Sequence, residues 1–337
     1  MSARVRVALD AMGGDNAPQA AIAGAAAALS AYPEIAVALV GKSDVVKSAL
    51  SGHSADMGRI EIIHASEVIG ADESPTAAVR RKKDSSIAVG LRLLKEDSAD
   101  AFVSAGSTGA LLTGAAVTLD RLPGVARPAL ATLLPTKTGG RVLLLDSGAN
   151  VDAKPEYLAQ FAAMGSVYME RAEGVSNPRV GLINIGAEAE KGNALTRAAY
   201  GLLAALPGIN FIGNAEPRDI PAGVCDVAVC DAFVGNVILK YSEGLAGALM
   251  SMLKRELMAT LPSKIGAALS KGAYKRLARA FDYEEVGGAP FLGLTKVVVK
   301  AHGSSGEKAF KNALGQALRF ASSGAAGGLA AKLAERQ

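Results

Sequence analysis

The stretch Val5-Arg6-Val7-Ala8-Leu9-Asp10-Ala11-Met12-Gly13-Gly14-Asp15-Asn16-Ala17-Pro18 contains the pattern around which the chain is organised. An apolar run that ends in an acid and a glycine pair predicts a buried strand followed by a tight loop. Asn16 is the expected N-cap of the next helix, with Pro18 in its first turn. Such a loop suits an anion, because backbone N–H groups and the helix dipole point at it. An ordinary tight turn between strand and helix is the alternative.

The composition bounds the fold class and the partners. The chain has 337 residues, of which 50% are apolar and 20% are charged, so a globular protein with a large core is expected. This length corresponds to about two domains or one large α/β unit. Because no composition break divides the chain, we predict a single α/β unit over residues 1–337. Trp is absent and aromatic residues are few, which leaves few stacking platforms for nucleic acid. No nucleic-acid partner is expected.

The cysteines and the apolar segments indicate a cytoplasmic protein. Cys225 and Cys230 flank a predicted strand, on which they should face opposite sides as free thiols in a reducing compartment. The first residues lack the uninterrupted apolar region of a signal peptide. No stretch reaches the roughly 18 apolar residues of a membrane-spanning helix.

Strands and helices alternate along the chain. Strands are expected at 5–9, 35–40, 59–64, 101–104, 142–145, 180–185, 227–230 and 297–299. The alternation predicts a large, doubly wound, mostly parallel sheet with helices on both faces. Six of the strands lead into small polar loops, which begin at Asp10, Ala105, Asp146, Gly186, Asp231 and Lys300. Because loops at the carboxyl ends of strands bind ligands in such sheets, we expect these six to form one shared site.

A helical hairpin is predicted between Leu245 and Phe281. Apolar residues recur there at every fourth position, with an interruption at Pro262, which indicates two amphipathic helices joined near that proline. Residues 251–281 contain seven basic residues and one acid, a net charge of +6, whereas the whole chain carries +4. Two interpretations stay open, namely packing against a second subunit and contact with anionic lipid. The candidate membrane residues are Leu257, Leu261 and Ile265.

Several common catalytic signatures are missing. The three histidines have no zinc-site spacing, and neither a G-x-S-x-G elbow nor a G-x-G-x-x-G fingerprint is present. Gly41-Lys42-Ser43 is not a P-loop, because the first glycine of that motif would fall at Ala36. The remaining anion-suited loops favour a reaction that positions a phosphate, with no metal and no cofactor.

Taken together, the loops resemble those of the bacterial acyl-acyl carrier protein:phosphate acyltransferases of phospholipid synthesis. The resemblance covers nearly the whole chain through the segments Ala8–Asp15, Ser104–Ala110, Gly148–Asp152, Lys191–Asn193 and Ala301–Gly303. Two places depart from the commoner family pattern. Ser107 stands where Asn is frequent, and Ala232 and Val234 stand where Gly and Thr are usual.

The resemblance implies both a reaction and an architecture. A long-chain acyl group would pass from the acyl carrier protein thioester to inorganic phosphate, and a membrane glycerol-3-phosphate acyltransferase would consume the acyl phosphate. The implied fold is similar to that of isocitrate and isopropylmalate dehydrogenases and of phosphotransacetylase. The family also implies a homodimer that contacts the inner face of the plasma membrane through helices at its tip, which makes it a peripheral, cytoplasmic protein.

Candidate site residues follow from the loops and the resemblance. The catalytic candidates are Lys191, Asn193, Asn236, His302 and Asp10. The substrate-binding candidates are Gly13, Gly14, Asp15, Gly106, Ser107, Thr108, Gly109, Asn150, Asp231 and Lys240. The glycine loops and the cations would hold phosphate, the asparagines would donate to the oxyanion, and the acids would orient groups or accept a proton. A helix cap or a loop-bracing hydrogen bond is the alternative role for each acid.

The acidic carrier protein that the family uses requires a basic docking surface. The candidates are Arg80 and Arg81 at one place and Lys271, Lys275, Arg276 and Arg279 at another. A solvated helix end is the alternative explanation of the first patch. Two other functions stay open: a phosphotransacetylase-like transferase that uses acyl-coenzyme A, and an inactive membrane scaffold for lipid-synthesis enzymes.

Overall fold

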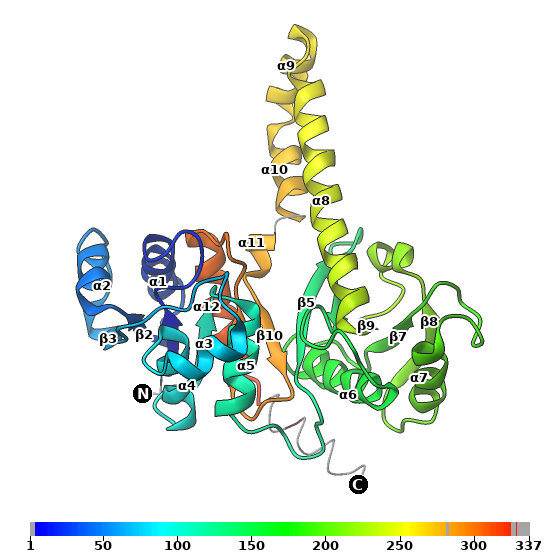
Figure 1. The fold of residues 1–337 in the computed structure, drawn as a ribbon. Coiled ribbons are helices and arrows are strands. Elements are labelled where there is room, and N and C mark those ends of the chain that lie inside the picture. The colour runs from blue at the N-terminus through cyan, green and yellow to red at the C-terminus, as the bar shows by residue number, and fades with distance from the viewer. Residues whose placement is uncertain (1–3, 281–282, 325–327, 329–337) are drawn as a thin grey trace.

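A computed structural model describes residues 4–280, 283–324 and 328, and one 11-stranded sheet runs through it (Figure 1). The strand order is β3-β2-β1-β4-β11-β10-β5-β6-β9-β7-β8. The strands are β1 (Val5–Asp10), β2 (Ile35–Gly41), β3 (Ile60–His64), β4 (Ala101–Ser104), β5 (Ala129–Pro135), β6 (Arg141–Leu145), β7 (Arg179–Ile183), β8 (Asn210–Ala215), β9 (Val227–Val229), β10 (Ala289–Leu292) and β11 (Val297–Lys300).

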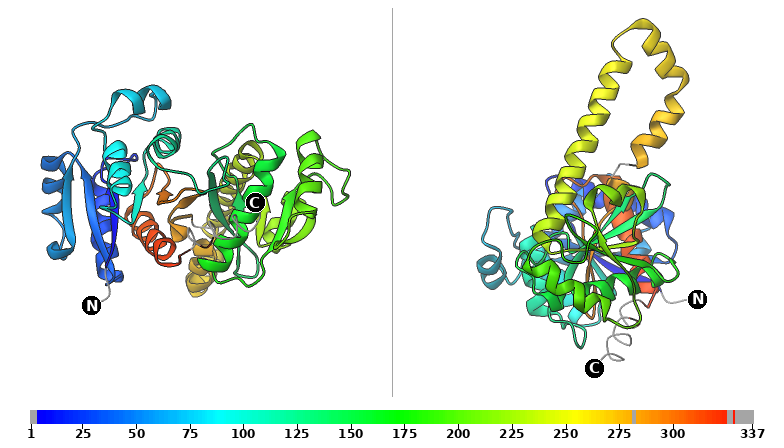
Figure 2. Two further views of the ribbon diagram at one scale, coloured as in Figure 1. Left: turned by 90° about the horizontal axis from the view of Figure 1, so that it is seen from below. Right: turned by 90° about the vertical axis from the view of Figure 1, so that its right-hand side faces the viewer.

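Helices cover both faces of this sheet (Figures 1 and 2). The α-helices are α1 (Gln19–Ala31), α2 (Ser43–Leu50), α3 (Pro75–Arg81), α4 (Ser86–Lys95), α5 (Thr108–Thr118), α6 (Pro155–Arg171), α7 (Ala194–Ala204), α8 (Ala232–Leu257), α9 (Leu261–Leu269), α10 (Lys271–Ala280), α11 (Tyr283–Val286) and α12 (Glu307–Ser322). Two short 3-10 helices are η1 (Met57–Arg59) and η2 (Pro217–Ala222). The expected α/β architecture is confirmed.

The central strand β1 shows why apolar runs here form a sheet buried on both faces. It pairs in parallel with β2 and β4. Val7 and Leu9 pack into the core cluster that contains α1 and α12, whereas Ala8 packs into the cluster that contains α4 and α5. All three side chains are 0% exposed. An uninterrupted apolar strand is therefore required, because both faces are covered.

Two antiparallel strands at the centre reverse the direction of the sheet. β10 pairs antiparallel with β11 and with β5, and β5 pairs antiparallel with β6. The strands β3-β2-β1-β4-β11 are parallel to one another, and so are β6-β9-β7-β8. These pairings make the two parallel sets run in opposite directions. The six polar loops consequently fall into two groups of three.

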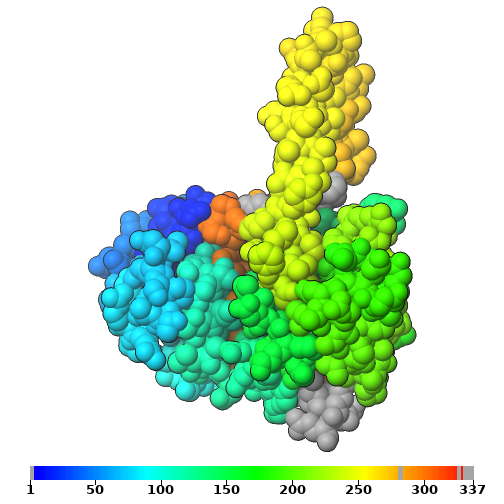
Figure 3. Space-filling view, turned by 45° about the vertical axis from the view of Figure 1, so that its right-hand side comes forward, coloured from blue at the N-terminus to red at the C-terminus, as the bar shows by residue number. Residues whose placement is uncertain are grey.

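The helix α8 leaves the body of the molecule and α9 and α10 return beside it, so that a long arm projects from the fold (Figures 1 and 3). The sequence pattern predicted a separate helix from Leu245, but α8 is one continuous helix of 26 residues that begins at Ala232. The returning segment is two helices, with a break at Ser270. Figure 2 shows α8 and α10 apart along much of the arm.

Two local expectations are wrong. Asn16 does not cap α1, because the helix begins at Gln19 and the Asn16 amide donates to the carbonyl oxygens of Ser304 and Ser305, at 3.1 and 3.4 Å. Cys225 and Cys230 do not lie on opposite sides of a strand, because β9 spans only Val227–Val229 and both thiols pack in one apolar cluster. Both cysteines are free, as expected.

Candidate functional site

The loops after β1, β4 and β11 form the most tightly connected candidate site, called here the β1/β4/β11 site. The Ser104 hydroxyl donates to the Asp10 carboxylate at 2.6 Å and accepts from the Gly106 backbone N–H at 3.0 Å. A Cβ atom at Gly13 would lie 2.7 Å from the Gly106 nitrogen, so only glycine permits this approach of the two loops. The Asp15 N–H donates to the carbonyl oxygen of Gly303 at 2.8 Å. Three chain segments far apart in sequence thus meet.

Asp10 lies at the base of this site with an exposed fraction of 1%. Burial raises the pKa of its carboxyl group, and hydrogen bonds from Ser104, Ser86 and backbone N–H groups oppose that rise. Its Oδ1 atom accepts from the Met12 N–H at 3.0 Å. Through its contacts to Ser104 and Met12, the Asp10 carboxylate holds the first loop against β4.

Lys300 is the buried cation of the site, and the sequence analysis did not select it. The residue ends β11 with an exposed fraction of 9%, and its ammonium group donates to the carbonyl oxygens of Ala105, at 3.3 Å, and Ala301. Burial lowers its pKa to about 8, and the negative charge of Asp10 opposes this shift. The sequence does contain a pattern that could have identified this residue, because Lys300 directly follows an apolar run and precedes the glycine loop at Gly303.

His302 and Lys240 lie near Lys300, as their electrostatic effects on one another show. The surrounding protein and then the charge of Lys240 lower the pKa of the His302 imidazole, which favours its neutral form near pH 7. The Ser304 N–H points to Nδ1 of this ring at 3.3 Å, which indicates the tautomer with a proton on Nε2. Lys240 lies nine residues into α8 beyond Asp231, about 13 Å along the helix. α8 begins in the second group of loops and places Lys240 close enough to Lys300 and His302 for its charge to lower the pKa values of both.

The loops after β6 and β9 form a second, strongly braced group. The Asp146 carboxylate accepts from the N–H groups of Leu130, Gly148, Ala149 and Asn150 at 2.8–3.1 Å, and from the Asn150 amide at 2.7 Å. The Asn150 amide also donates to the carbonyl oxygen of Pro128 at 2.8 Å, so both of its N–H donors are in use. This arrangement gives Asn150 a bracing role.

Three of the other predicted residues serve as helix caps. The side chains of Asp231, Asn193 and Ser107 accept from backbone N–H groups in the first turns of α8, α7 and α5, at 2.8, 2.9 and 3.4 Å. Each side chain therefore provides an acceptor for an otherwise unpaired N–H group in the first turn of its helix, in addition to any contact with a ligand. Asn236 is exposed near the start of α8.

The Lys191 segment follows β7, which belongs to the second parallel set. The Asn184 amide donates to the carbonyl oxygen of Lys191 at 3.0 Å, and Arg197 donates to that of Gly192 at 2.7 Å. These bonds fix the turn that leads into α7 and leave the Lys191 side chain exposed. The segment lies in the other group of loops from His302 and Lys300.

The basic residues expected to dock a carrier lie on two exposed surfaces. Arg80 and Arg81 end α3, and the α10 patch (Lys271, Lys275, Arg276 and Arg279) lies on the returning helix of the arm. Lys82, beside the first pair, is engaged with Glu73 at 2.5 Å. Within the described residues, no group of His, Cys, Asp and Glu side chains could hold a metal ion.

Comparisons with known proteins match this architecture. A family model described as "Fatty acid synthesis protein" matches residues 5–327. A phosphate acyltransferase of Clostridium botulinum is 52% identical over 313 residues, which is 92% of each chain. The chain belongs to the fatty acid synthesis protein family. The family that the loops resemble is thus confirmed, and its relatives support phosphate-linked acyl transfer as the reaction class.

Solved structures support the fold of this family member. A phosphotransacetylase from Streptococcus pyogenes superposes with a TM-score of 0.63 at 18% identity, and covers 94% of each chain. A 4-hydroxythreonine-4-phosphate dehydrogenase from Burkholderia phymatum gives a TM-score of 0.51 at 14% identity, over 94% of this chain and 98% of that one. The expected similarity to phosphotransacetylases and to a dehydrogenase fold is confirmed.

Proposed function

We propose that this chain transfers a long-chain acyl group from an acyl carrier protein thioester to inorganic phosphate, with acyl phosphate as the product. The observation that carries the proposal is the β1/β4/β11 site, where a buried lysine lies among three glycine loops that belong to three separate strands. A cation with surrounding N–H groups suits a phosphate dianion. The family and its relatives support an acyl group as the other substrate.

In the proposed reaction a phosphate oxygen attacks the thioester carbonyl carbon. The carbonyl oxygen becomes negative, the carbon–sulfur bond then breaks, and the sulfur leaves as a thiolate that takes up a proton. Lys300, with Lys240 and the Gly106–Gly109 loop, would hold phosphate. The Nε2–H of the neutral His302 ring would donate a hydrogen bond to the leaving thiolate, which takes up the proton that hydrogen phosphate releases. One well-placed donor to the oxyanion would contribute about 3 kcal/mol.

The donor is tested by mixing the purified protein with phosphate and either palmitoyl-carrier protein or palmitoyl-coenzyme A. We expect phosphate-dependent release of free carrier thiol, with kcat/KM at least about tenfold higher for the carrier thioester. A preference for the coenzyme A thioester would support the phosphotransacetylase-like alternative. Absence of thiol release from both donors would support the scaffold alternative.

Lys191 and Asn193 are proposed to contact phosphate from the loop after β7. Asn193→Ala should lower stability by about 1 kcal/mol because the cap of α7 is lost. Asn193→Ser retains a capping hydroxyl, and should therefore keep the stability while it raises the phosphate KM about tenfold, as should Lys191→Ala. If Lys191→Ala and Asn193→Ser both leave the phosphate KM and kcat unchanged, this loop does not belong to the phosphate site.

The proposed homodimer and carrier docking involve exposed surfaces of α8, α10 and α3. Phe233, Val237, Tyr241 and Leu245 recur every fourth residue on α8 with exposed fractions of 45–69%. An apolar stripe of this kind supports packing against a second copy. The α10 patch and the Arg80–Arg81 pair offer positive charge to an acidic carrier protein.

The tip of the arm is proposed to lie on an anionic membrane, where a glycerol-3-phosphate acyltransferase would receive the product. Leu261, Ile265 and Leu269 have exposed fractions of 72%, 56% and 85% there. Exposed apolar residues beside lysines suit the interface of an anionic bilayer. None of the described helices is long and apolar enough to cross a bilayer.

Leu261→Glu should release the protein from vesicles that contain anionic lipid, because it places a charge at the most apolar part of the interface. Co-sedimentation with such vesicles measures the effect, and we expect the bound fraction to fall at least about fivefold. Met57→Glu, at a residue 58% exposed on η1, is the matched control. Equal sedimentation of the two variants would argue against insertion of the tip.

A further inference from the structure

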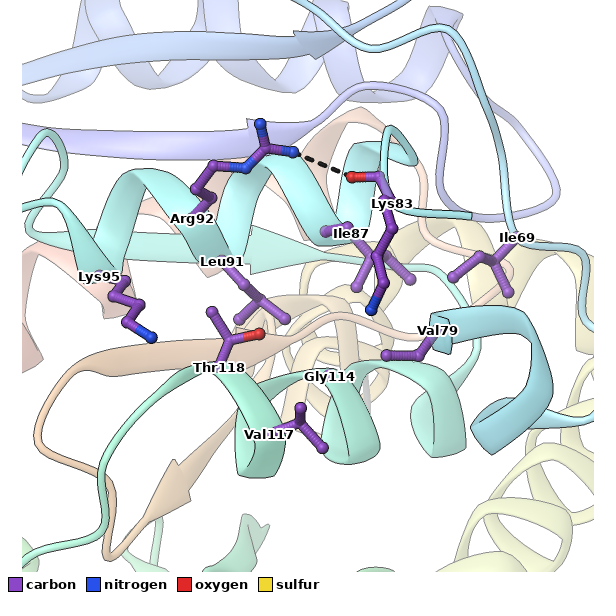
Figure 4. Close-up of a pocket in the computed structure, with 11 residues that line it drawn as sticks. Ile69, Val79, Lys83, Ile87, Leu91, Arg92, Lys95, Gly114, Val117 and Thr118 are labelled. Atoms are coloured by element: carbon purple, nitrogen blue, oxygen red, sulfur yellow. Dashed lines mark hydrogen bonds between the residues drawn. The ribbon is translucent and has the colours of Figure 1, made fainter. Parts of the chain in front are cut away.

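A groove between α4 and α5 lies outside the residues assigned so far. Its volume is about 430 Å³, and its lining comes from α4, α5 and the segments around α3 (Figure 4). The floor is apolar and buried: Ile69, Val79, Ile87 and Leu91 have exposed fractions of 0–8%. Gly114 permits the close approach of the two helices, since a Cβ atom there would lie 2.8 Å from Leu91 Cδ1. The result is a hollow with an apolar floor that opens to solvent.

The rim of this groove is positively charged. Lys83, Arg92 and Lys95 line it, and all three are exposed, whereas none of the described lining residues is acidic. The Arg92 guanidinium donates to the carbonyl oxygen of Lys83 at 2.9 Å, and the Lys83 side chain points toward α5 (Figure 4). An apolar floor with a cationic rim is complementary to an anionic amphiphile.

The groove extends along α4. Ile87, Leu91 and Lys95 are spaced four residues apart, so they follow one face of the helix for about 12 Å. A volume of about 430 Å³ falls in the range of small-molecule pockets, about 300–1,000 Å³. A volume of this size suits a single alkyl chain.

One end of the groove adjoins the β1/β4/β11 site. The Ile87 Cδ1 atom, which lines the groove, lies 3.1 Å from the Cβ position of Gly106. The preceding residue, Ser86, donates a hydrogen bond to the Asp10 carboxylate. The side chain of Ile87 thus lies between the groove and the loop proposed to hold phosphate.

We propose that the α4–α5 groove binds the alkyl chain of a long-chain fatty acyl compound. Two sources share this chemistry: the acyl group of the substrate or product, and a free fatty acid. Only the first source rests on the proposed function. The floor covers the alkyl carbons, and the rim cations attract the head where it is anionic, as in acyl phosphate or a fatty acid.

Val117→Glu tests the groove directly. Val117 lines it with an exposed fraction of 71%, so the fold should tolerate the new carboxylate, which puts a charge beside the alkyl chain and repels the carboxylate of a fatty acid. Ala116→Glu is the matched control, because Ala116 is exposed on the same helix and is not part of the lining. Calorimetric titration with palmitate should show binding to the unaltered protein and to the control, and at least tenfold weaker binding to Val117→Glu. Equal binding of palmitate by the two variants would overturn the proposal.

Kinetics with thioesters of different length identify the source of the chain. If the groove holds the substrate, Val117→Glu should raise the KM for a palmitoyl-carrier thioester at least tenfold and leave that for a hexanoyl thioester unchanged. If palmitate binding is lost without this difference, the groove holds a free fatty acid. An equal, salt-sensitive rise in KM for both lengths, with palmitate binding intact, would overturn the proposal in favour of carrier docking. The palmitate titration needs no turnover, so its result stands apart from the outcome of the transferase assay.

Discussion

Replacement of Lys300 by Met is expected to lower kcat/KM for phosphate at least about 100-fold, which corresponds to about 3 kcal/mol of transition-state stabilisation. The ammonium group lies buried beside the Ala105 carbonyl oxygen, at the meeting point of three loops. There its charge is screened little by water, and a phosphate dianion would experience most of it. Met is similar in length and uncharged, so the fold should be retained. Lys296→Met, at a lysine beside the start of the same strand, should change kcat/KM less than about twofold.

The pH dependence separates the charge of Lys300 from its bulk. Because burial lowers its pKa to about 8, kcat/KM for phosphate should decline above about pH 8 as the free enzyme loses this charge. Deprotonation of Lys300 does not promote unfolding, so a loss of folded protein through this group cannot explain the decline. Between pH 8 and the ordinary lysine pKa of 10.5, the unfolded state keeps the proton and the native state does not, so stability rises with pH. Persistence of the alkaline decline in Lys300→Met would assign it to another group.

Gly235→Ala is expected to lower the free energy of unfolding by about 3 kcal/mol or more, because the first turn of α8 lies directly against the loop after β6. A Cβ atom at position 235 would lie 1.9 Å from the carbonyl oxygen of Asp146. This backbone cannot give way easily, because the Asp146 side chain is held by five N–H donors. The base of α8 must therefore move, and Lys240 should move with it, away from His302. Thermal unfolding and phosphate KM measure the two effects.

Gly244→Ala is the matched control on the same helix. A Cβ atom there meets no heavy atom within 4 Å, and the residue is exposed. Alanine in a helix interior is favoured over glycine by about 1 kcal/mol, so this variant should be as stable as the original or more stable. A similar loss of stability in both variants would show that close approach at Gly235 does not determine the position of α8.

Local patterns in the sequence determined much of the fold. Apolar runs such as Val5–Leu9 predicted strands because a parallel strand covered on both faces needs apolar side chains at every position. The glycine and acid loops at the strand ends carried the resemblance to the family, and the comparisons confirm it. One helix boundary also followed from a local signal, since α8 ends at Leu257 and α9 begins at Leu261, beside the predicted interruption at Pro262.

Only the tertiary structure decided how these parts are placed. β10 and β5 pair with each other although about 160 residues separate them, and local periodicity carries no information on that pairing or its direction. The resulting reversal divides the six loops into two groups, and the continuous α8 returns Lys240 to the first group. Asn16 binds the Ser304 carbonyl oxygen instead of capping α1 for the same reason, since its partner comes from a distant segment. The burial that shifts the pKa of Lys300 likewise depends on neighbours from β1 and β4. A short stretch of sequence contains information only about residues close together in the chain. Strand pairing, burial and the charge environment arise from contacts between segments far apart in the chain.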